Sequence, residues 1–478
     1  MTNTFAVWFR TDFRFYDQPA LFYGLKAAKE LDGKLMLIYH LDPGFTDHID
    51  LHHDYFFQTL HHFYKQCEKR GLHLHIIYGE LEEALNKLVH AQPNLKGVFY
   101  NRDIAGEGKK RDDVATRWFH NKGIDTYDFN GTHIHEPKDV LKKDGSYYKV
   151  FTPYFRTWST KHVPLPLSSN FHELKLYHLE SDPIDREGEH FFFHHILTKS
   201  TFTWEGIGEE SAQERHKQFV EERLITYRDD RDTPYKDGSS RLSPYIKTGN
   251  LSVRSIYHTV MNRLDEAGAG AESFLKELAW RDFYYMIHYF QPEAKDVELN
   301  EKYRTIPWNR NLDFFSLWKE GKTGFPLVDA GMRQLNQTGW MHNRLRMVTA
   351  SFLTKDYLID WRLGERYFQE KLIDYDASSN IGGWQWAASV GTDAVPYFRV
   401  FHPVKQSVRF DPNGRFIKAF VPELKHVPEK YIHEPHKMTE DFQKEAGCMI
   451  GVDYPAPTVD HRIQRKRAIQ LFKGDEEN

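Results

Sequence analysis

The sequence predicts an α/β N-terminal domain with a Rossmann-like parallel sheet, followed by an all-α helical C-terminal domain. Short β-rich runs alternate with helix-length segments over the first 130 residues, which is typical of parallel strands joined by helical crossovers. Beyond residue 201 strand patterns nearly vanish and helical periods dominate. At 478 residues the chain also exceeds what one hydrophobic core usually supports, so more than one domain is expected.

The expected strands cover residues 4–9, 34–39, 73–78 and 97–100. Each is short and β-rich, and each is separated from the next by a segment long enough to form a helix. No Gly-x-Gly-x-x-Gly motif follows the first strand, so this domain is not expected to bind a dinucleotide.

The regular period fades from about residue 131 to residue 200, where prolines and many Ser, His and Lys residues indicate a long connector. Helical periods follow at residues 271–290, 324–337 and 341–360. We therefore expect an α/β domain over residues 1–130, a linker over 131–200 and a helical domain over 201–478.

The composition is that of a globular protein in a reducing compartment, with 40% hydrophobic and 15% aromatic residues. Only Cys67 and Cys448 are present, and they are too far apart to indicate a disulfide framework or a metal site. No apolar run is long enough to span a membrane and no signal peptide is recognisable, so we expect a soluble, cytoplasmic protein. A net charge of −4 argues against bulk electrostatic binding of nucleic acid, so any DNA contact needs a local basic patch.

One candidate ligand-binding face lies on the helix expected after Trp340. Asn343, Arg346 and Met347 stand at positions i, i+3 and i+4, so their side chains share one face. A solvated arginine beside a gap-filling methionine explains the pattern equally well.

A second candidate face repeats this spacing with Glu277, Trp280, Arg281 and Tyr284. Its carboxylate could bind the edge of a base while the neighbouring indole stacks on that base. An ordinary amphipathic helix with an internal ion pair is the alternative.

The segment Ser239-Ser240-Arg241-Leu242-Ser243 precedes a helical run and could cradle phosphate, or could simply cap the helix. Asp374-Tyr375-Asp376 holds two carboxylates one residue apart, which could form a hydrolytic pair, bind a metal or pair with Arg346. No nearby histidine spacing supports a metal, and we expect no metal site. Four tryptophans gather near these motifs, although a core position is the default for large aromatic side chains; they are Trp308, Trp361, Trp384 and Trp386.

Taken together, these segments resemble the cryptochrome/photolyase family, and most closely the class I cyclobutane pyrimidine dimer (CPD) photolyases of microbes. The likeness runs from WFRTDFR at residues 8–14 through KVFTP at 149–153 to VPEL at 421–424. Phe13 and Gln18 depart from the family pattern, which usually has Leu and Asn at these positions.

The resemblance implies a bound FAD in the helical domain. Its phosphates would be held by Ser239 to Ser243 and Tyr227, and its ring would lie beside Asp374, Tyr375 and Asp376. Asp374 would pair with Arg346, and Asn380 would face flavin N5. The family's photoreduction chain matches Trp384, Trp361 and Trp308, in order from flavin to surface.

The resemblance also implies a DNA substrate that contains cyclobutane pyrimidine dimers. The lesion pocket would be formed by Glu277, Trp280, Asn343, Met347 and Trp386, with Tyr284 on the same helix. Glu277 would bind a thymine edge and stabilise the lesion after electron injection. Arg231, Arg281, Arg344 and Gln406 would grip the DNA backbone and supply the local basic patch.

The antenna chromophore matches the family less closely. Folate-binding relatives carry an Asn-Glu pair where this chain has Glu107-Gly108, whereas Lys295 matches the folate-contacting lysine. Methenyltetrahydrofolate is the first expectation, and a deazaflavin, a flavin or no antenna stay open.

The implied activity is that of a deoxyribodipyrimidine photo-lyase, in which light-excited reduced FAD lends an electron to the dimer and receives it back. A (6-4) photolyase is disfavoured, because that group carries paired histidines where this chain has His342-Asn343. A cryptochrome light receptor is the third alternative, and the expected lack of a long tail after the helical stretch 460–472 favours repair. We expect a monomer with no obligate protein partner and no membrane contact.

Overall fold

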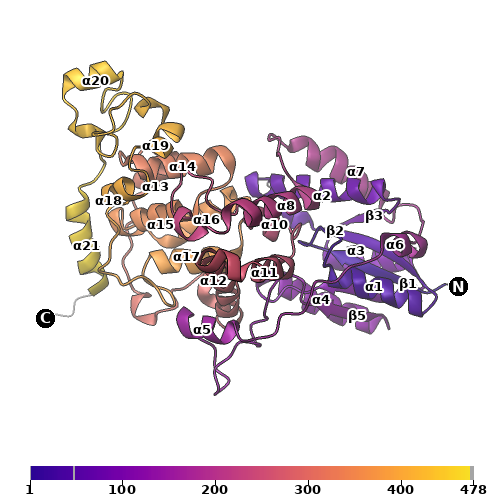
Figure 1. Ribbon diagram of the computed structural model, residues 1–478. Helices are drawn as coiled ribbons and strands as arrows, with labels where there is room; N and C mark the ends of the chain where they lie inside the picture. The colour runs from indigo at the N-terminus through magenta and orange to yellow at the C-terminus, as the bar shows by residue number, and fades with distance from the viewer. Residues whose placement is uncertain (1, 47–48, 474–478) are drawn as a thin grey trace. The chain divides into compact units, whose positions relative to one another are not determined.

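The computed structural model describes residues 2–46 and 49–473 (Figure 1). These residues form two compact units. Unit 1 comprises residues 1–147, 152–225 and 240–292, and unit 2 comprises residues 148–151, 226–239 and 293–478. The domain boundaries expected at residues 130 and 200 remain predictions.

Unit 1 is built on a five-stranded parallel sheet with the order β3-β2-β1-β4-β5. Its strands are β1 (Thr4–Phe9), β2 (Lys34–Leu41), β3 (Leu74–Tyr78), β4 (Leu95–Asn101) and β5 (Asp125–Phe129). The four strands expected from the sequence are confirmed. The sequence did not reveal β5, because this edge strand is polar and mostly exposed and so lacks an apolar signal.

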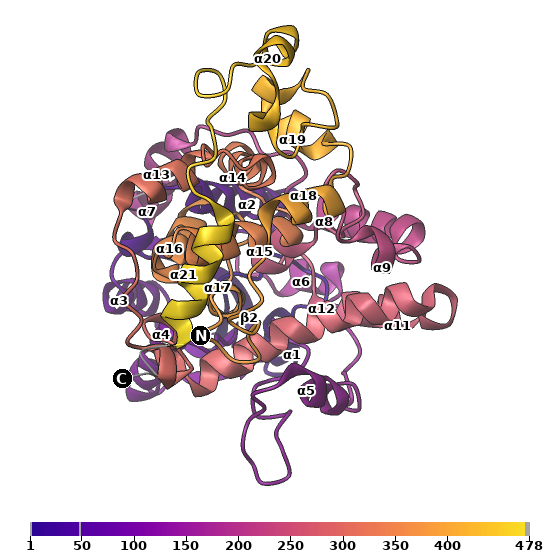
Figure 2. The same cartoon turned by 90° about the vertical axis from the view of Figure 1, so that its left-hand side faces the viewer.

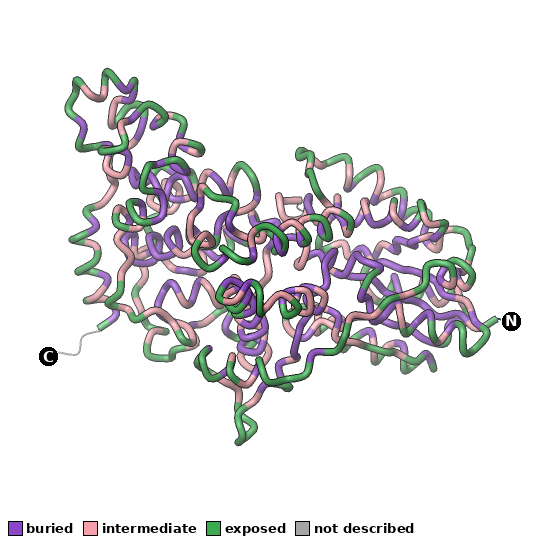
Figure 3. Tube along the Cα trace, in the orientation of Figure 1, coloured by how far each residue is buried: buried purple, intermediate pink, exposed green. Residues whose placement is uncertain are grey.

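Helices cover both faces of the sheet. One core layer packs α1 (Pro19–Glu30) and α2 (Leu51–Lys69) against residues such as Phe5, Val7 and Leu37. The other packs α3 (Leu81–Ala91) and α4 (Gly106–Asn121) against Trp8 and Ile38. Since both faces are covered, β1 is buried along its whole length (Figure 3) and reads as a continuous apolar run.

Short helices follow the sheet strands in unit 1. The elements between residues 131 and 225 are α5 (Phe151–Trp158), α6 (Phe171–Tyr177), α7 (Arg186–Phe191), η2 (Phe192–Ile196), η3 (Leu197–Lys199), α8 (Gly208–Gln218) and η4 (Phe219–Arg223). A 3-10 turn, η1 (Pro43–Phe45), follows β2. The unit closes with α10 (Ser243–Lys247), α11 (Val253–Met261) and α12 (Leu264–Phe290). Gly268 kinks α12 near its start with a φ of 46°.

Asp282 on α12 is buried, and its carboxylate accepts hydrogen bonds from Trp158 Nε1 and from the His135 backbone N–H, both at 3.0 Å. Burial raises the pKa of this carboxyl from 3.8 to about 6. At pH values between these two pKa values, Asp282 therefore keeps a proton in the folded state that it has lost in the unfolded chain. The stabilising contribution is complete at acidic pH and is lost as the pH rises through 6.

Replacing Asp282 with asparagine is expected to remove this pH dependence of the free energy of unfolding. Between pH 5 and pH 7 the wild type should lose about 1 kcal/mol more free energy of unfolding than Asp282→Asn. Urea unfolding at both pH values measures the difference. The control is Asp265→Asn, at an exposed position of the same helix. Identical pH dependence in all three proteins would contradict the assignment.

Unit 2 is helical, and its described residues form no strand. Its elements are α9 (Tyr227–Asp230), η5 (Pro292–Lys295), η6 (Glu301–Tyr303), α13 (Leu312–Glu320), α14 (Pro326–Thr338), α15 (Asn343–Ser351), η7 (Phe352–Asp356), α16 (Trp361–Lys371), α17 (Ala377–Ala387), α18 (Pro403–Phe410), α19 (Arg415–Phe420), η8 (Pro422–Leu424), η9 (Pro435–Lys437), α20 (Glu440–Ala446) and α21 (His461–Lys473). Here α14 packs against α15, α18 and α19 (Figure 2). No described helix has the length and hydropathy that crossing a bilayer requires.

Candidate active site

An ion pair in unit 2 joins α15 to the loop before α17. Arg346 Nη2 lies 2.7 Å from Asp374 Oδ2, and Arg346 Nε donates to the Met341 carbonyl oxygen at 2.9 Å. The Asp374 side chain is 1% exposed, whereas that of Arg346 is 26% exposed. Asp374 Oδ1 is buried and accepts no hydrogen bond from the described residues. The pair therefore presents one unused acceptor, which suits a ligand that carries an N–H donor.

A second group of polar side chains fixes the first turn of α17. Asp376 caps this helix by accepting from the Ser379 N–H at 2.8 Å. Asn380 Nδ2 donates to Glu365 Oε1 at 3.0 Å, and the Tyr375 hydroxyl donates to the same oxygen at 3.1 Å. The carboxylate thus fixes the orientation of the Asn380 amide, with the carbonyl oxygen at its other end.

Glu365 was not among the residues expected from the sequence. It lies on α16, where burial raises the pKa of its carboxyl. A signal was available, because Glu365 is four residues after Trp361 and three before Phe368, on the buried face of an amphipathic helix. A carboxylate in such a position requires hydrogen-bonding partners.

The tryptophans of unit 2 differ in burial. Trp361 and Trp384 belong to the buried core, while Trp308 and Trp386 are half-buried and pack against it. The Trp384 ring fits tightly: a Cβ on Gly364 would lie 2.1 Å from it. Its edge-on neighbours are Phe368, at 5.0 Å between ring centroids, and Trp318, at 6.0 Å.

Trp318 is a further aromatic residue that the sequence did not single out. It is fully buried, and its indole N–H donates to the Thr349 carbonyl oxygen at 3.0 Å. The sequence offered only an isolated tryptophan on an amphipathic helix, for which a core position is the default reading.

The predicted lesion-binding residues of unit 1 lie on α12. Trp280 stacks on Tyr284 with 5.5 Å between ring centroids, and Glu277 lies one turn earlier and is half-buried. Arg281 donates through Nη1 to the Thr132 carbonyl oxygen at 2.7 Å and lies over the Tyr285 ring. One of its donors therefore already serves the fold, and the remaining ones are the candidates for phosphate contact.

The other residues expected to bind DNA belong to unit 2. Arg344 pairs with Asp232 at 2.8 Å and lies over the Phe410 ring. Arg231 lies 5.4 Å from the Tyr227 ring centroid. Asn343 begins α15 and Met347 is one turn along it, so the structure places them on the same helix as Arg344 and Arg346. Gln406 is on α18.

The Ser239 to Ser243 segment leads into α10. Arg241 has a φ of 53°, a left-handed conformation that costs a non-glycine residue about 1 kcal/mol or more. The Ser240 carbonyl oxygen accepts from Arg215 Nε at 2.9 Å, and Leu242 is buried. Arg241 is thus held in this strained conformation by the contacts of Ser240 before it and Leu242 after it. Such backbone strain is frequent in ligand-binding loops.

The two residues expected to contact an antenna are exposed. Glu107, near the start of α4, forms a surface ion pair with Lys110 at 2.8 Å, and Lys295 ends η5. In parallel sheets of this kind a ligand crevice is common at the carboxyl ends of neighbouring strands such as β1 and β4. Here buried Arg10 directly follows β1 and pairs with Asp112 at 2.9 Å. The assignment of Glu107 and Lys295 as antenna contacts remains a prediction.

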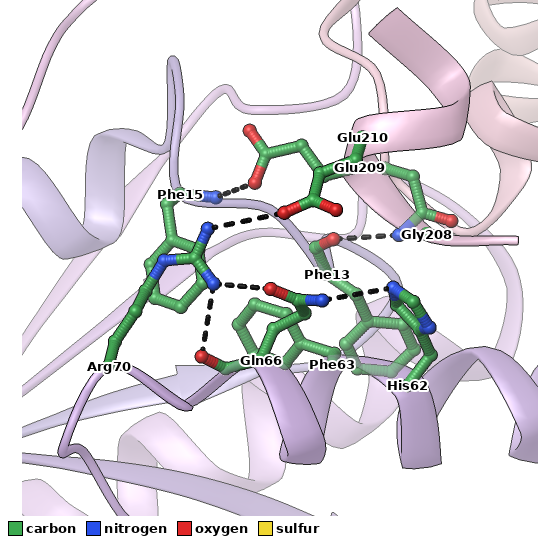
Figure 4. A pocket seen from close by; sticks show the side chains of 10 residues that line it. Phe13, Phe15, His62, Phe63, Gln66, Arg70, Gly208, Glu209 and Glu210 are labelled. Atoms are coloured by element: carbon green, nitrogen blue, oxygen red, sulfur yellow. Dashed lines mark hydrogen bonds and ion pairs between the residues drawn. The ribbon is translucent and has the colours of Figure 1, made fainter. Parts of the chain in front are cut away.

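A small cavity in unit 1 lies where the chain after β1 meets α2 and the start of α8 (Figure 4). Its volume is about 10 Å³, roughly the space that one water molecule needs. Glu209 closes it by accepting from the backbone N–H groups of Phe15 and Tyr16 at 2.9 and 3.0 Å, and Arg70 contacts Gln66 on α2. The cavity is too small for a chromophore.

The chain thus combines an α/β unit on a parallel sheet with a helical unit that holds the Arg346-Asp374 ion pair and several tryptophans, and this two-unit architecture defines its class. Comparison with known proteins identifies it. A family model described as "DNA photolyase" matches residues 5–170, and one described as "FAD binding domain of DNA photolyase" matches residues 274–474. The chain belongs to the DNA photolyase family.

Individual relatives agree with this assignment. The chain is 52% identical to the deoxyribodipyrimidine photo-lyase of Alkalihalophilus pseudofirmus, over 99% of this chain and 98% of the relative. Its fold is similar to that of a bacterial class III photolyase from Agrobacterium tumefaciens, with a TM-score of 0.85 and 33% identity over 99% and 98% of the two chains. It is equally similar in fold to a Synechocystis cryptochrome, with a TM-score of 0.85 and 29% identity over 98% and 99% of the chains.

Proposed function

We propose that this protein is a deoxyribodipyrimidine photo-lyase, which uses FAD and light to repair cyclobutane pyrimidine dimers in DNA. The observation that carries this function is the 52% identity, along almost the whole length of both chains, to a protein of that name. The FAD-binding family model covers the helices that hold the Arg346-Asp374 pair and Asn380.

Arg346, Asp374 and Asn380 of unit 2 fit an FAD. Asp374 keeps a buried free acceptor for a ring N–H, and Arg346 balances its charge. The orientation of Asn380 is set by Glu365. Ser239 to Ser243 and Tyr227 are the candidates for the phosphates, and the φ of Arg241 supports a specialised loop. When bound, FAD supplies light absorption and a transferable electron, which no side chain offers.

We assign the lesion to Glu277, Trp280, Asn343, Met347 and Trp386, and the DNA backbone to Arg231, Arg281, Arg344 and Gln406. The stacked pair Trp280 and Tyr284 supports this role, because flat aromatic faces bind bases displaced from the duplex. Trp384, Trp361 and Trp308 are proposed to pass an electron between the buried core and the surface, which agrees with their burial.

Repair is tested by illuminating the reduced holoprotein with an oligonucleotide that carries one cyclobutane thymine dimer. We expect the dimer content to fall under blue light and to stay constant in the dark. Unchanged dimer content under blue light would overturn the proposal and favour a receptor role, which the fold similarity to the Synechocystis cryptochrome keeps as the second candidate. An oligonucleotide with a (6-4) photoproduct is the substrate control.

Three finer assignments complete the proposal. Methenyltetrahydrofolate is the proposed antenna, with Glu107 and Lys295 as contacts, and a spectrum of the purified protein that lacks a folate band would end that assignment. The protein is proposed to act as a cytoplasmic monomer without an obligate protein partner. Gel filtration coupled to light scattering checks the monomer.

A further inference from the structure

Two histidines and a glutamate converge at the edge of the sheet in unit 1. His73 immediately precedes edge strand β3, and His75 is its second residue. Residues two apart on an extended chain point to the same face, so both imidazoles project together. Their ring centroids are 4.4 Å apart. Glu189 comes from α7, a helix that packs along β3.

The three side chains offer ligand atoms to a common point. One atom from each of His73, His75 and Glu189 lies within 4.8 Å of the others, and His73 Nε2 is 3.0 Å from Glu189 Oε1. Two donors bound to one tetrahedral zinc ion lie about 3.4 Å apart, given bond lengths near 2.1 Å. Small side-chain rotations therefore close the site. Among the described residues no other group of His, Cys, Asp and Glu side chains meets this condition.

The site is buried and incompletely satisfied. His75 is 0% exposed and Glu189 is 8% exposed. His75 Nδ1 is buried without a hydrogen-bond partner among the described residues, while His75 Nε2 lies 3.4 Å from Ser181 Oγ, so Nδ1 is the ring nitrogen left for a ligand. His73 is partly exposed, which leaves an entry path for an ion.

The surrounding structure holds the ligands in place. His178 Nε2 accepts from the His73 backbone N–H at 2.9 Å. At the start of α7, Asp185 accepts from the Tyr78 N–H and from Lys87 Nζ, both at 3.0 Å, so the helix is anchored to the end of β3. Glu189 is one helical turn beyond this anchor and is thereby directed to His73. Such support is what a preorganised metal site requires.

We propose that His73, His75 and Glu189 bind one divalent transition-metal ion of the zinc type, which links edge strand β3 to α7. Two imidazole nitrogens and one carboxylate suit zinc, cobalt or nickel and do not suit magnesium or calcium, which prefer oxygen ligands alone. The ion joins edge strand β3 to α7 and so stabilises unit 1. Because an ion bound to the folded chain joins segments far apart in sequence, its binding energy adds to the stability of the fold.

The test is zinc binding by the full-length holoprotein. After dialysis against micromolar zinc, mass spectrometry of the metal content should find one zinc per chain in the wild type. Glu189→Gln and His73→Gln should weaken zinc binding by about tenfold or more. The matched control is Glu187→Gln, at an exposed position of the same helix, which should bind zinc like the wild type. X-ray absorption of the wild type should show nitrogen and oxygen ligands with imidazole scattering.

Thermal unfolding gives an independent readout. Zinc at about 100 times its dissociation constant should raise the unfolding temperature of the wild type and Glu187→Gln by about 5 °C, and that of Glu189→Gln by much less. The unfolding temperatures of all variants without metal show that they fold. Equal zinc affinity in wild type and Glu189→Gln, or a wild type that retains no zinc, would overturn the proposal.

Discussion

Arg346→Ala is expected to lower the free energy of unfolding by about 3 kcal/mol and to abolish retention of FAD. The substitution leaves Asp374, with a side chain 1% exposed, as a buried carboxylate without its counter-charge. It also removes the hydrogen bond from Arg346 Nε to the Met341 carbonyl oxygen. Urea unfolding of the apoprotein measures the first effect, and the ratio of flavin to protein absorbance after gel filtration measures the second.

A matched control separates this effect from the loss of any arginine. Arg366→Ala removes an exposed guanidinium from neighbouring α16 and should change stability by less than about 0.5 kcal/mol. Adding Asp374→Asn to Arg346→Ala should restore about 1 kcal/mol or more, because the buried group is then neutral. A double variant less stable than Arg346→Ala would show that the pair is not what stabilises this region.

Glu277→Ala is expected to slow repair about 100-fold, equivalent to about 2.7 kcal/mol of lost transition-state stabilisation, while DNA affinity changes less than about threefold. The reason is the proposed role of Glu277, a hydrogen bond to the thymine edge that matters most after the electron has entered the lesion. Trp280 and Tyr284, which stack on each other one and two turns later, keep the binding surface intact.

The measurement combines two assays. Single-turnover repair of a dimer-containing oligonucleotide under saturating light gives the rate, and fluorescence anisotropy in the dark gives the affinity. Glu272→Ala, at an exposed position of the same helix, serves as the control and should leave both unchanged. Equal losses in rate and affinity would contradict the role assigned to Glu277 and reduce it to a binding contact.

Most of the secondary structure was readable from local patterns. The four buried strands and the helical runs at residues 271–290 and 324–337 lie close to where the sequence predicted them, whereas the run expected at 341–360 forms α15 and η7 and ends at Asp356. The polar edge strand β5 was missed because nothing on its exposed face requires apolar residues. The short helices α5, α6 and α7 formed in a segment whose period had faded, since contacts such as those of α7 with β3 stabilise them.

The candidate site was predictable only in part. Spacing along one helix placed Asn343, Arg346 and Met347 on a shared turn, and the resemblance to photolyases supplied their roles. Neither the spacing nor the resemblance could reveal that Glu365 accepts a hydrogen bond from Asn380, fifteen residues away in sequence, or that the Trp318 ring packs edge-on against Trp384.

The sequence by itself determined the alternation of strands and helices, the helical second half and the family to which the chain belongs. The resemblance already implied that Asp374 pairs with Arg346. The tertiary structure decided which other polar groups meet: Glu365 with Asn380, and Glu189 with His73 and His75. The physical reason is the range of each signal. Hydrophobic periodicity is set by neighbours within a turn or a strand, whereas a buried polar contact depends on how distant elements pack and which partners burial leaves available.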